Sequence, residues 1–328
     1  MFRSLSVTRF GTGSNLFLKK VNYYESHYQI NVVRNFNYAA SVQSIWKSMS
    51  ESTPVHYVQE GLVTFHDTTG LPWWATIIIS TITLRTLITL PLTVYQYKVM
   101  GRLEKIGQEF PKVLEELKKE TAYAVKKFNW TEKQAKVMFA HSARKQWNNL
   151  VIRDNCHPAK TAVTIWFQLP LWVIQSVAIR NIVYCMPDPN SIEAKMTLAE
   201  LTVGGFGWIP NLTEVDASYI LPVTLGIVNL LVIQIQTSIR KTGPPSKLQN
   251  IATNAFRVLS IVMVPIAATV PSCLCLYWVS SSMYGLGQNL AFISPRIRRL
   301  FGVPQLSHLP RENPYRNLVH RMFNKKET

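Results

Sequence analysis

Four long apolar runs divide the chain into segments of very different polarity. They are Trp73–Tyr97, Thr161–Val183, Ile220–Ile239 and Phe256–Ile293. A helix rises about 1.5 Å per residue, so each of the first three can cross a hydrocarbon core of about 30 Å. The last run has 38 residues, about twice the length needed, and Pro271 offers a turn inside it. The pattern predicts an all-α polytopic membrane protein with five transmembrane helices.

Between the first two runs, the apolar positions follow a different helical pattern. One face of a helix is marked by Val99, Leu103, Ile106, Phe110, Val113 and Leu117. Thr131 and Gln134 have the spacing of a capping box, which predicts the start of a second helix. The stripe of that helix is Phe139, Ala143, Trp147 and Leu150. We therefore expect a helical hairpin over residues 98–157, with a kink or a short break near Pro111. Its role as a lid or as a spacer stays open.

A shorter amphipathic segment precedes the first apolar run. Its apolar face is formed by Val55, Val58, Leu62 and Phe65. Pro54 suits the first turn of a helix, and Gly70 with Pro72 ends it. Such a helix is expected to lie in the membrane interface, followed by Trp73 at headgroup level.

Basic residues are spread unevenly among the loops, and the chain as a whole carries a formal net charge of +17. The segments 98–160, 240–257 and 294–328 hold 14, 4 and 8 basic residues against 7, 0 and 2 acidic ones. The connection 181–219 holds one lysine and five acids. Because basic loops stay on the side from which a membrane protein is inserted, the first three segments face the cytoplasm or its organellar equivalent.

The composition of the N-terminal segment predicts the membrane in which the protein lies. Residues 1–40 begin with several basic, Ser and Thr residues and have no acid before Glu25, which is typical of a mitochondrial transit peptide. The expected domains are then this peptide, an intermembrane-space segment over 41–72, a five-span core over 73–293 that includes the hairpin, and a matrix tail over 294–328. The N-terminus of the mature protein would lie in the intermembrane space and its C-terminus in the matrix of a multi-pass inner-membrane protein.

Arg85 lies in the middle of the first apolar run, and none of the four runs contains an acidic residue. A charge at this depth costs about 2.5–3.5 kcal/mol and is normally turned toward a bundle interior or a wet cavity. Polar residues at helical spacing on the other spans predict the remaining walls of such a cavity, although each could also be interhelical packing. The candidate groove residues are Arg85, Thr81, Thr89, Gln168, Gln175, Asn229, Gln236, Ser281 and Gln288.

Several function classes find little support in these residues. No carboxylate pair or nucleophile with a base occurs in the spans, so neither an enzyme nor a bound cofactor is expected. Cys156 and His157 lack the second pair that a metal site needs. The lysines of the hairpin alternate with glutamates rather than with stacking aromatics, which argues against nucleic acid. A solute or anion transporter with Arg85 as its binding site stays the alternative, although the spans offer no acid or histidine for proton coupling.

The order of elements, the central arginine and the run Pro271–Asn289 resemble the YidC/Oxa membrane-protein insertase family. In that run the signature residues are Pro271, the Tyr277-Trp278 pair and the polar Gln288-Asn289 end. Three further strings resemble the branch of the family that assembles cytochrome c oxidase, namely Leu71–Trp74, Val151–Pro158 and Pro265–Pro271. The resemblance covers residues 54–295.

This resemblance implies an insertase that exports polar tails and inserts membrane segments through a hydrophilic groove. The implied client is cytochrome c oxidase subunit II, whose C-terminal domain must reach the intermembrane space. Other complex IV assembly factors and inner-membrane lipid are the further partners implied. About 35 residues follow Ile293, and four prolines interrupt them. Stable ribosome docking is therefore not expected, in contrast to the relative with a long, basic, helical extension.

Overall fold

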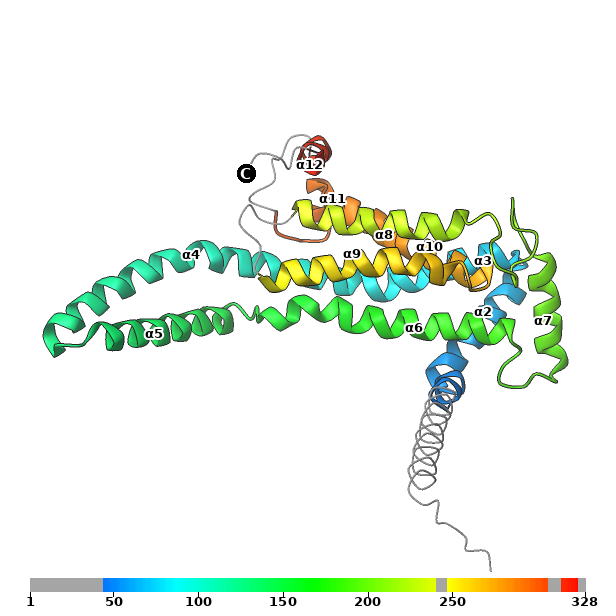
Figure 1. Cartoon of the computed structure of the whole chain (residues 1–328), viewed down its shortest axis with the longest axis horizontal. Helices are drawn as coiled ribbons and strands as arrows, with labels where there is room; N and C mark the ends of the chain where they lie inside the picture. Colours follow the sequence, from blue (N-terminus) through cyan, green and yellow to red (C-terminus); the bar gives the residue numbers. More distant parts are fainter. Residues whose placement is uncertain (1–43, 240–246, 306–313, 324–328) are drawn as a thin grey trace, which may run out of the picture. The chain divides into compact units, whose positions relative to one another are not determined.

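The computed structural model describes residues 44–239, 247–305 and 314–323 (Figure 1). The predicted transit peptide over 1–40 lies outside the described residues. The chain divides into two compact units, residues 1–56 and 57–328, and the second unit carries everything described below. The described part of this unit is helical and forms no strands.

The described elements of the chain are helices and short helical turns. From the N-terminal side these elements are α2 (Thr53–Thr69), α3 (Trp73–Leu84), the π-helical turn η1 (Arg85–Thr89), α4 (Leu90–Phe128), α5 (Glu132–Arg153) and the 3₁₀ turn η2 (Pro158–Ala162). They continue with α6 (Val163–Val183), α7 (Ile192–Val203), α8 (Ile220–Ile239), α9 (Lys247–Ala267), α10 (Ser272–Ala291), α11 (Pro295–Leu300) and α12 (Pro314–Phe323).

Four helical stretches are long and apolar enough to cross a membrane by length and composition. They are Trp73–Phe128, Pro158–Val183, Ile220–Ile239 and Gln249–Ala267. The predicted fifth span coincides with α10, which has 20 residues but is richer in serine and amides. The described chain is thus all-helical and has four candidate membrane-spanning helices by this criterion.

Helices α9 and α10 meet where the sequence predicted a turn. Helix α9 ends at Ala267, and α10 begins at Ser272 with Pro271 as its N-cap residue. Proline cannot donate a backbone hydrogen bond, so a helix start is a favourable place for it. The prediction of a turn at Pro271 is confirmed, whereas α9 starts nine residues earlier than the apolar run suggested.

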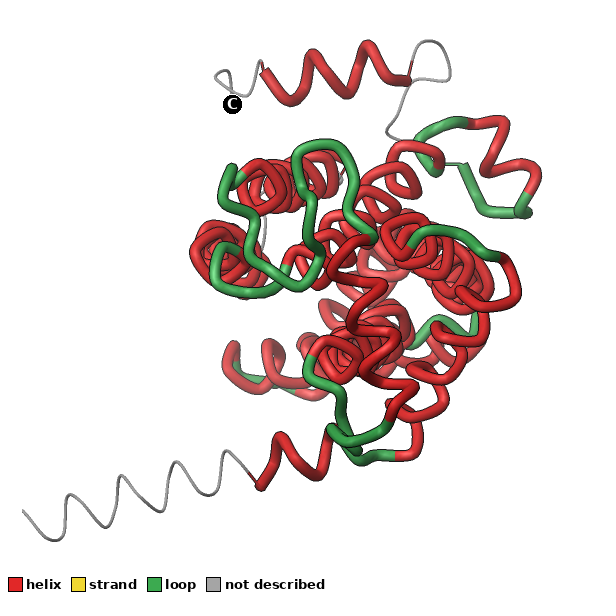
Figure 2. The backbone as a smooth tube through the Cα atoms, turned by 90° about the vertical axis from the view of Figure 1, so that its right-hand side faces the viewer, coloured by secondary structure: helices red, strands yellow, loops and turns green. Residues whose placement is uncertain are grey.

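Helix α10 is the central member of the bundle. It packs against α8, α3 and α6, while α9 packs against α8, and Figure 2 shows these helices nearly end-on. Its first half is buried from Ser272 to Val279. Gly226 allows the close approach of α8 and α9, because a Cβ at this position would lie 2.5 Å from Val264 Cγ2.

Most of α4, from Lys98 onward, and the whole of α5 form a separate region that we call the arm, residues 98–153. The two helices lie side by side and run in opposite directions (Figure 1). The capping box of Thr131 and Gln134 is present, as predicted. The arm core consists of Val99, Ile106, Leu150, Val151 and Cys156, with Leu103, Phe110, Val113 and Trp147 packed against it.

Proline 111 has a smaller effect on the arm than expected. Helix α4 is continuous from Leu90 to Phe128 with Pro111 inside it, so the helix is not broken there, and it curves instead (Figure 1). Proline removes the hydrogen bond to the carbonyl of Gly107 and crowds that turn. Gly107 has no neighbouring atom within 4 Å of the place where a Cβ would lie, which leaves room for the distortion.

The amphipathic segment before the first span forms α2, and it ends as the sequence predicted. Gly70 follows the helix with a φ of +62°, a left-handed conformation that glycine adopts without a Cβ clash. Glu200 of α7 contacts a residue on each side of this turn, His66 in α2 and Trp73 in α3. Its carboxylate lies 3.2 Å from Nε2 of His66 and accepts a hydrogen bond from the indole of Trp73 at 3.3 Å.

Candidate functional site

Arg85 is the first residue of the π-helical turn η1, which follows α3 directly in the continuous helical rod formed by α3, η1 and α4. Its side chain is directed into the bundle, and the residue is 8% exposed. Within the described chain, Ser281 of α10 is the recorded hydrogen-bond partner of its guanidinium, through Nη2. π-Helical turns inside α-helices are rare and frequently lie at functional sites.

Threonines on the same rod satisfy the backbone around this turn. Thr89 donates its hydroxyl to the carbonyl of Arg85 at 2.7 Å, and Thr81 donates to the carbonyl of Ile77 at 2.6 Å. The Arg85 carbonyl also accepts the backbone N–H of Leu90, so the Thr89 hydroxyl is a second donor to it. Thr81 also accepts a hydrogen bond from the side-chain amide of Gln175, at 3.2 Å. The amide links α6 to the rod one turn away from Arg85.

The structure brings five of the nine predicted groove residues together in a buried cluster. They are Thr81, Arg85, Thr89, Gln175 and Ser281, which we call the Arg85 cluster. Asn229 lies on a neighbouring interface, where it accepts a hydrogen bond from Ser282 at 2.8 Å. Gln168 and Gln288 are half-buried, and Gln236 is exposed on α8. No hydrogen bond within the described chain joins these last three side chains to the cluster.

Two tyrosines, rather than carboxylates, are the electrostatic neighbours of the Arg85 guanidinium. They are Tyr277 and Tyr284 of α10. The hydroxyl of Tyr284 lies 3.1 Å from that of Thr86, which ties α10 to η1. No ion pair of Arg85 is recorded in the described residues. Within the part of the chain that the structure describes, the guanidinium thus has hydroxyl groups rather than carboxylates beside it.

Sequence reasoning missed the aromatic contact that holds α6 against α10. Tyr277 donates its hydroxyl to the carbonyl of Trp172 at 3.2 Å, and the indole of Trp278 donates to Ser176 at 3.0 Å. The rings of Trp172 and Trp278 lie 5.5 Å apart. The four-residue spacing of Trp172 and Ser176 could have indicated a shared face, although not its partner.

A pocket in the same unit has a different character. It is lined by Leu62, Trp73, Ile77, Ile179, Ile182 and Leu201. These side chains belong to the end of the bundle that α2 and α7 cover, at least two helical turns from Arg85 along the rod. The pocket is apolar, so it does not contribute to the electrostatics of the Arg85 cluster.

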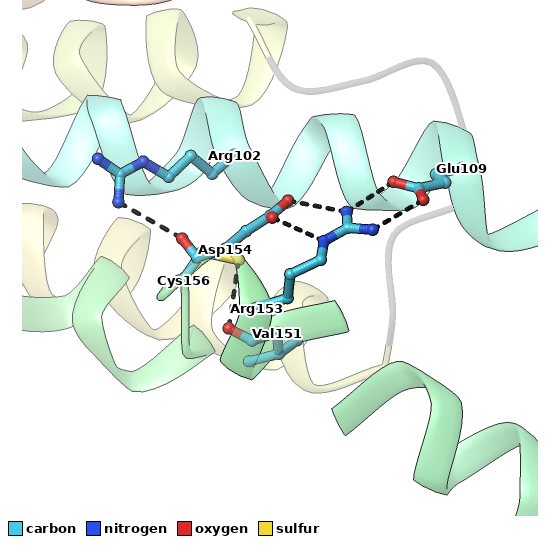
Figure 3. Close-up of polar contacts among 6 residues, drawn as sticks. All are labelled: Arg102, Glu109, Val151, Arg153, Asp154 and Cys156. Carbon is cyan, nitrogen blue, oxygen red and sulfur yellow. Dashed lines mark hydrogen bonds and ion pairs between the residues drawn. The ribbon is translucent and has the colours of Figure 1, made fainter. Parts of the chain in front are cut away.

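A second arginine, Arg153, organises the base of the arm (Figure 3). Its guanidinium donates to both carboxylate oxygens of Glu109 at 3.0 and 2.8 Å, and to Asp154 at 2.9 and 3.2 Å. These bonds hold the pKa values of Glu109 and Asp154 below their usual range and raise that of Arg153. Arg102 of α4 donates to the carbonyl of Asp154 at 3.4 Å.

The turn after Arg153 buries a cysteine against the arm core. Asn155 has a φ of +51°, in the left-handed region that Asn tolerates better than most residues. This conformation directs the chain back so that Cys156 is fully buried, with its thiol near the carbonyl of Val151 at 3.9 Å. Burial raises the pKa of the Cys156 thiol, which makes it a poor nucleophile.

The sequence that forms the bundle and the arm is similar to those of known proteins. Residues 64–298 match the family described as 60Kd inner membrane protein. This range is more than half of the chain and includes both the Arg85 cluster and the arm. The chain belongs to this family, the YidC/Oxa membrane-protein insertases.

Relatives in this insertase family extend the match almost to the whole chain. The mitochondrial cytochrome c oxidase assembly protein COX18 of Mus musculus is 41% identical over 280 residues, 85% of this chain and 83% of the relative. The protein of the same description from Homo sapiens is 37% identical over 86% of this chain and 82% of its own. The mitochondrial inner membrane protein OXA1 of Arabidopsis thaliana is 24% identical over 83% and 57%.

These relatives and the apolar helices agree on the location of this insertase-family member. The relatives are mitochondrial, and the Arabidopsis protein is described as an inner-membrane protein. The chain itself has several helices able to cross a membrane. It is a mitochondrial inner-membrane protein with several apolar helices.

Proposed function

We propose that this protein is an insertase of cytochrome c oxidase assembly, which moves polar client segments across the inner membrane. Each unsatisfied backbone polar group of such a segment costs several kcal/mol in hydrocarbon. A groove that presents hydrogen-bonding groups and a positive charge at mid-depth lowers this barrier. The apolar helix of the client then leaves sideways into lipid. The contribution of the protein is physical, and no covalent chemistry is required.

The observation that carries this proposal is the charge balance at Arg85. A buried arginine usually has a carboxylate partner, because an uncompensated charge in a medium of low dielectric constant is costly. Arg85 instead meets Ser281 and lies near two phenols. The positive potential is thus left free to attract an acidic or polar segment. The groove would be lined by the Arg85 cluster together with Gln168, Asn229, Gln236 and Gln288.

The proposed topology has five spans, with α10 as the fifth. Because α10 is central to the bundle and follows α9 after a turn of four residues, it runs back along the spans that it contacts. The helical hairpin built from the arm then lies in the matrix, together with residues 294–328. Residues 41–72 and the acidic connection 181–219 lie in the intermembrane space, and residues 1–40 are the transit peptide.

The client that we propose is cytochrome c oxidase subunit II, and the segment exported is its C-terminal domain. Support comes from the descriptions of the mouse and human relatives as cytochrome c oxidase assembly proteins. Other complex IV assembly factors and inner-membrane lipid are the further partners. We propose no stable ribosome docking and no nucleic-acid partner. Capture of nascent chains on the protein in mitochondria tests the client directly.

Substitution of Arg85 tests the function itself. The full-length protein is compared with Arg85→Lys and Arg85→Ala in mitochondria, and export of the client tail is measured per unit of inserted protein. Lysine keeps the charge but loses the planar fork of donors. Lysine should retain much of the export, whereas alanine should lose about tenfold or more, equivalent to about 1.4 kcal/mol per factor of ten. Full export by the alanine variant would overturn the proposal.

The same variants separate export from a bracing role for Arg85. If the arginine chiefly stabilises the bundle through Ser281, both substitutions lower the abundance of inserted protein together.

A solute or anion transporter is the second candidate, because a buried cation also suits an anion. Proteoliposomes distinguish the two: uptake of labelled anions without tail export supports transport, and tail export without anion uptake supports insertion.

Tags placed at three positions test the orientation. A tag after Pro189 should be accessible to protease once the outer membrane is opened. Tags after Lys119 and at Thr328 should stay protected until the inner membrane is opened, because the loops that carry them are basic. Protection of the Pro189 tag under conditions that expose Thr328 would reverse the topology.

A further inference from the structure

The chain that follows α10 folds back on itself around a buried arginine. Arg298 of α11 is 3% exposed. Its Nε donates to the carbonyl of Phe292 at 2.7 Å, and its Nη1 donates to the carbonyl of Pro304 at 2.6 Å. Phe292 is the C-cap residue of α10, where helix carbonyls lack partners in the helix and a cation is favoured. The guanidinium thus joins both ends of residues 292–304, which we call the clasp.

The end of α11 brings Pro304 back toward this arginine. Gly302 has a φ of +61°, and its amide donates to the carbonyl of Arg299 at 3.1 Å. The amide of Val303 donates to the carbonyl of Arg298 at 2.8 Å. These two bonds form a Schellman motif, in which a left-handed glycine reverses the chain after a helix. Val303, the residue after the glycine, is buried.

The clasp packs against α4 at the place where the arm begins. The guanidinium carbon of Arg298 lies 5.3 Å from the ring centroid of Tyr97, which is a cation–π contact. The rings of Tyr97 and Phe292 have their centroids 5.0 Å apart. One turn along α4, a Cβ at Gly101 would lie 2.6 Å from Cγ of Pro304. The proline ring therefore reaches the helix because glycine has no side chain there.

The clasp and the hairpin partner α5 hold opposite faces of α4. Val99 is fully buried in the arm core. Gly101 is two residues further along, so the two positions point about 200° apart around the helix. Tyr97 is four residues before Gly101 and shares its face. A swing of the arm relative to α10 therefore has to move or break the contacts of the clasp.

We propose that the clasp fixes the direction of the arm relative to α10, with Arg298 as its positioning residue. Helix α10 carries Ser281, which accepts the hydrogen bond from Arg85, so the clasp joins the arm to a helix that borders the proposed groove. The arm is thereby held in one orientation for a client segment that approaches the bundle. This inference goes beyond the proposed function, and only its consequence for client binding rests on that function.

Two arginines of α11 provide a matched pair for the test. Spin labels at Lys145 on α5 and Asn250 on α9, both exposed, measure the arm against the bundle in the full-length protein in proteoliposomes. The four native cysteines are buried and should stay unlabelled. Arg298→Ala should broaden the distance distribution about twofold, because a segment that loses its contacts samples more orientations. Arg296→Ala removes the same charge at an exposed position of α11 and should leave the distribution unchanged.

Two further substitutions separate the geometry of the clasp from its charge. Arg298→Lys keeps the positive charge, but its single nitrogen cannot reproduce the fork that bonds two carbonyls. It should broaden the distribution nearly as much as alanine does. A distribution that stays narrow with lysine would show that charge alone holds the arm, and it would overturn the positioning role of the guanidinium.

Glycine substitutions act on the arm side of the same contact. Gly101→Ala should displace Pro304 and broaden the Lys145–Asn250 distribution. Gly107→Ala makes the same exchange in the same helix, and a Cβ at Gly107 has no atom within 4 Å, so the width should stay unchanged. The distance between Lys112 and Lys145 should stay constant in every variant, which shows that the arm itself and its curve are intact.

Client crosslinking to the arm tests the consequence for function. Per unit of protein that resists alkaline extraction, crosslinking should fall severalfold in Arg298→Ala and Gly101→Ala, and it should stay normal in Arg296→Ala and Gly107→Ala. A broad distribution with normal crosslinking would overturn the positioning role.

The spin labels decide the clasp independently of the client. An unchanged Lys145–Asn250 distribution in both Arg298→Ala and Gly101→Ala overturns the clasp, whatever the protein does. Absence of client crosslinking in the original protein contradicts the proposed function instead, while broadening confined to Arg298→Ala and Gly101→Ala still supports the clasp.

Discussion

Arg85 in the bundle and Arg153 at the base of the arm differ in their exposure to solvent and in the groups that their guanidiniums bond. Arg85 is 8% exposed and bonds a serine hydroxyl. The side chain of Arg153 is 49% exposed and bonds the carboxylates of Glu109 and Asp154. Among the residues that the structure describes, the buried arginine thus has no acidic partner, whereas the exposed one has two.

This difference separates a functional charge from a structural one. Water screens the ion pairs of Arg153, so they fix the geometry between α4 and α5 at little cost in desolvation. Arg85 has no such screening, and its burial is unfavourable for folding by itself. An unfavourable charge that no neighbouring acid neutralises is hard to explain by stability alone. It favours a role in binding an anionic group from outside the protein.

The largest expected effect comes from placing an unpaired charge in the arm. Leu103→Asp combined with Ile106→Asp puts carboxylates in the arm core, where Ile106 is fully buried. An uncompensated buried charge costs about 3–5 kcal/mol. The two helices should separate, and limited proteolysis should cut within residues 98–153 while the spans stay inserted. Client crosslinking should fall as well.

Lys112→Asp is the matched control for this change, because Lys112 is exposed on the same helix. It should leave both proteolysis and crosslinking unaltered. Normal client crosslinking in the double aspartate variant, despite an opened arm, would show that the arm is only a spacer between the spans.

A smaller effect is expected when the exposed arginine is removed. Arg153→Ala frees the end of α5 from Glu109, and the turn that buries Cys156 should open more often. In a variant that retains Cys156 as its one cysteine, maleimide labelling at constant pH should become several-fold faster. Arg144→Ala, at an exposed position on the same helix, should label at the original rate. Equal rates for the two variants would contradict a pinning role for Arg153.

The smallest effect is the response of the same contacts to pH. The hydrogen bonds from Arg153 hold the pKa values of Glu109 and Asp154 below their ordinary values. Because both carboxyl groups titrate lower in the folded arm than in the unfolded chain, their contribution is complete at neutral pH and is lost as pH falls through the folded pKa values.

Spin labels at the exposed positions Lys112 and Lys145 measure this response as a distance distribution across the arm. The distribution should be constant through neutral and mildly acidic pH and should broaden only when the pH falls below the ordinary carboxylate range, where these two groups become protonated. Glu109→Gln should show the broader distribution at neutral pH already. Broadening between pH 7 and pH 6 in the original protein would point to a different titrating group.

The regular parts of the fold were predictable because hydrophobic period and helix signals are local. The alternation from Val99 to Leu117 indicated the α4 face that packs in the arm, and Thr131 with Gln134 indicated the start of α5. The boundaries of α9 and the continuity of α4 through Pro111 were not predictable. Tertiary packing extends or tolerates a helix where local propensity alone would end it.

The sequence by itself determined that an arginine lies in an apolar run with no acid in any of the four runs, and that serine and glycine follow each other at helical spacing on α10. Only the tertiary structure decided which of the polar residues meet. It places Thr81, Gln175 and Ser281 around Arg85 and leaves Gln236 exposed. Helical period defines the face of each helix, but the rotation of one helix against another depends on packing between residues far apart in the chain. For that reason Ser281, rather than Gln168 or Gln288, is the partner of Arg85.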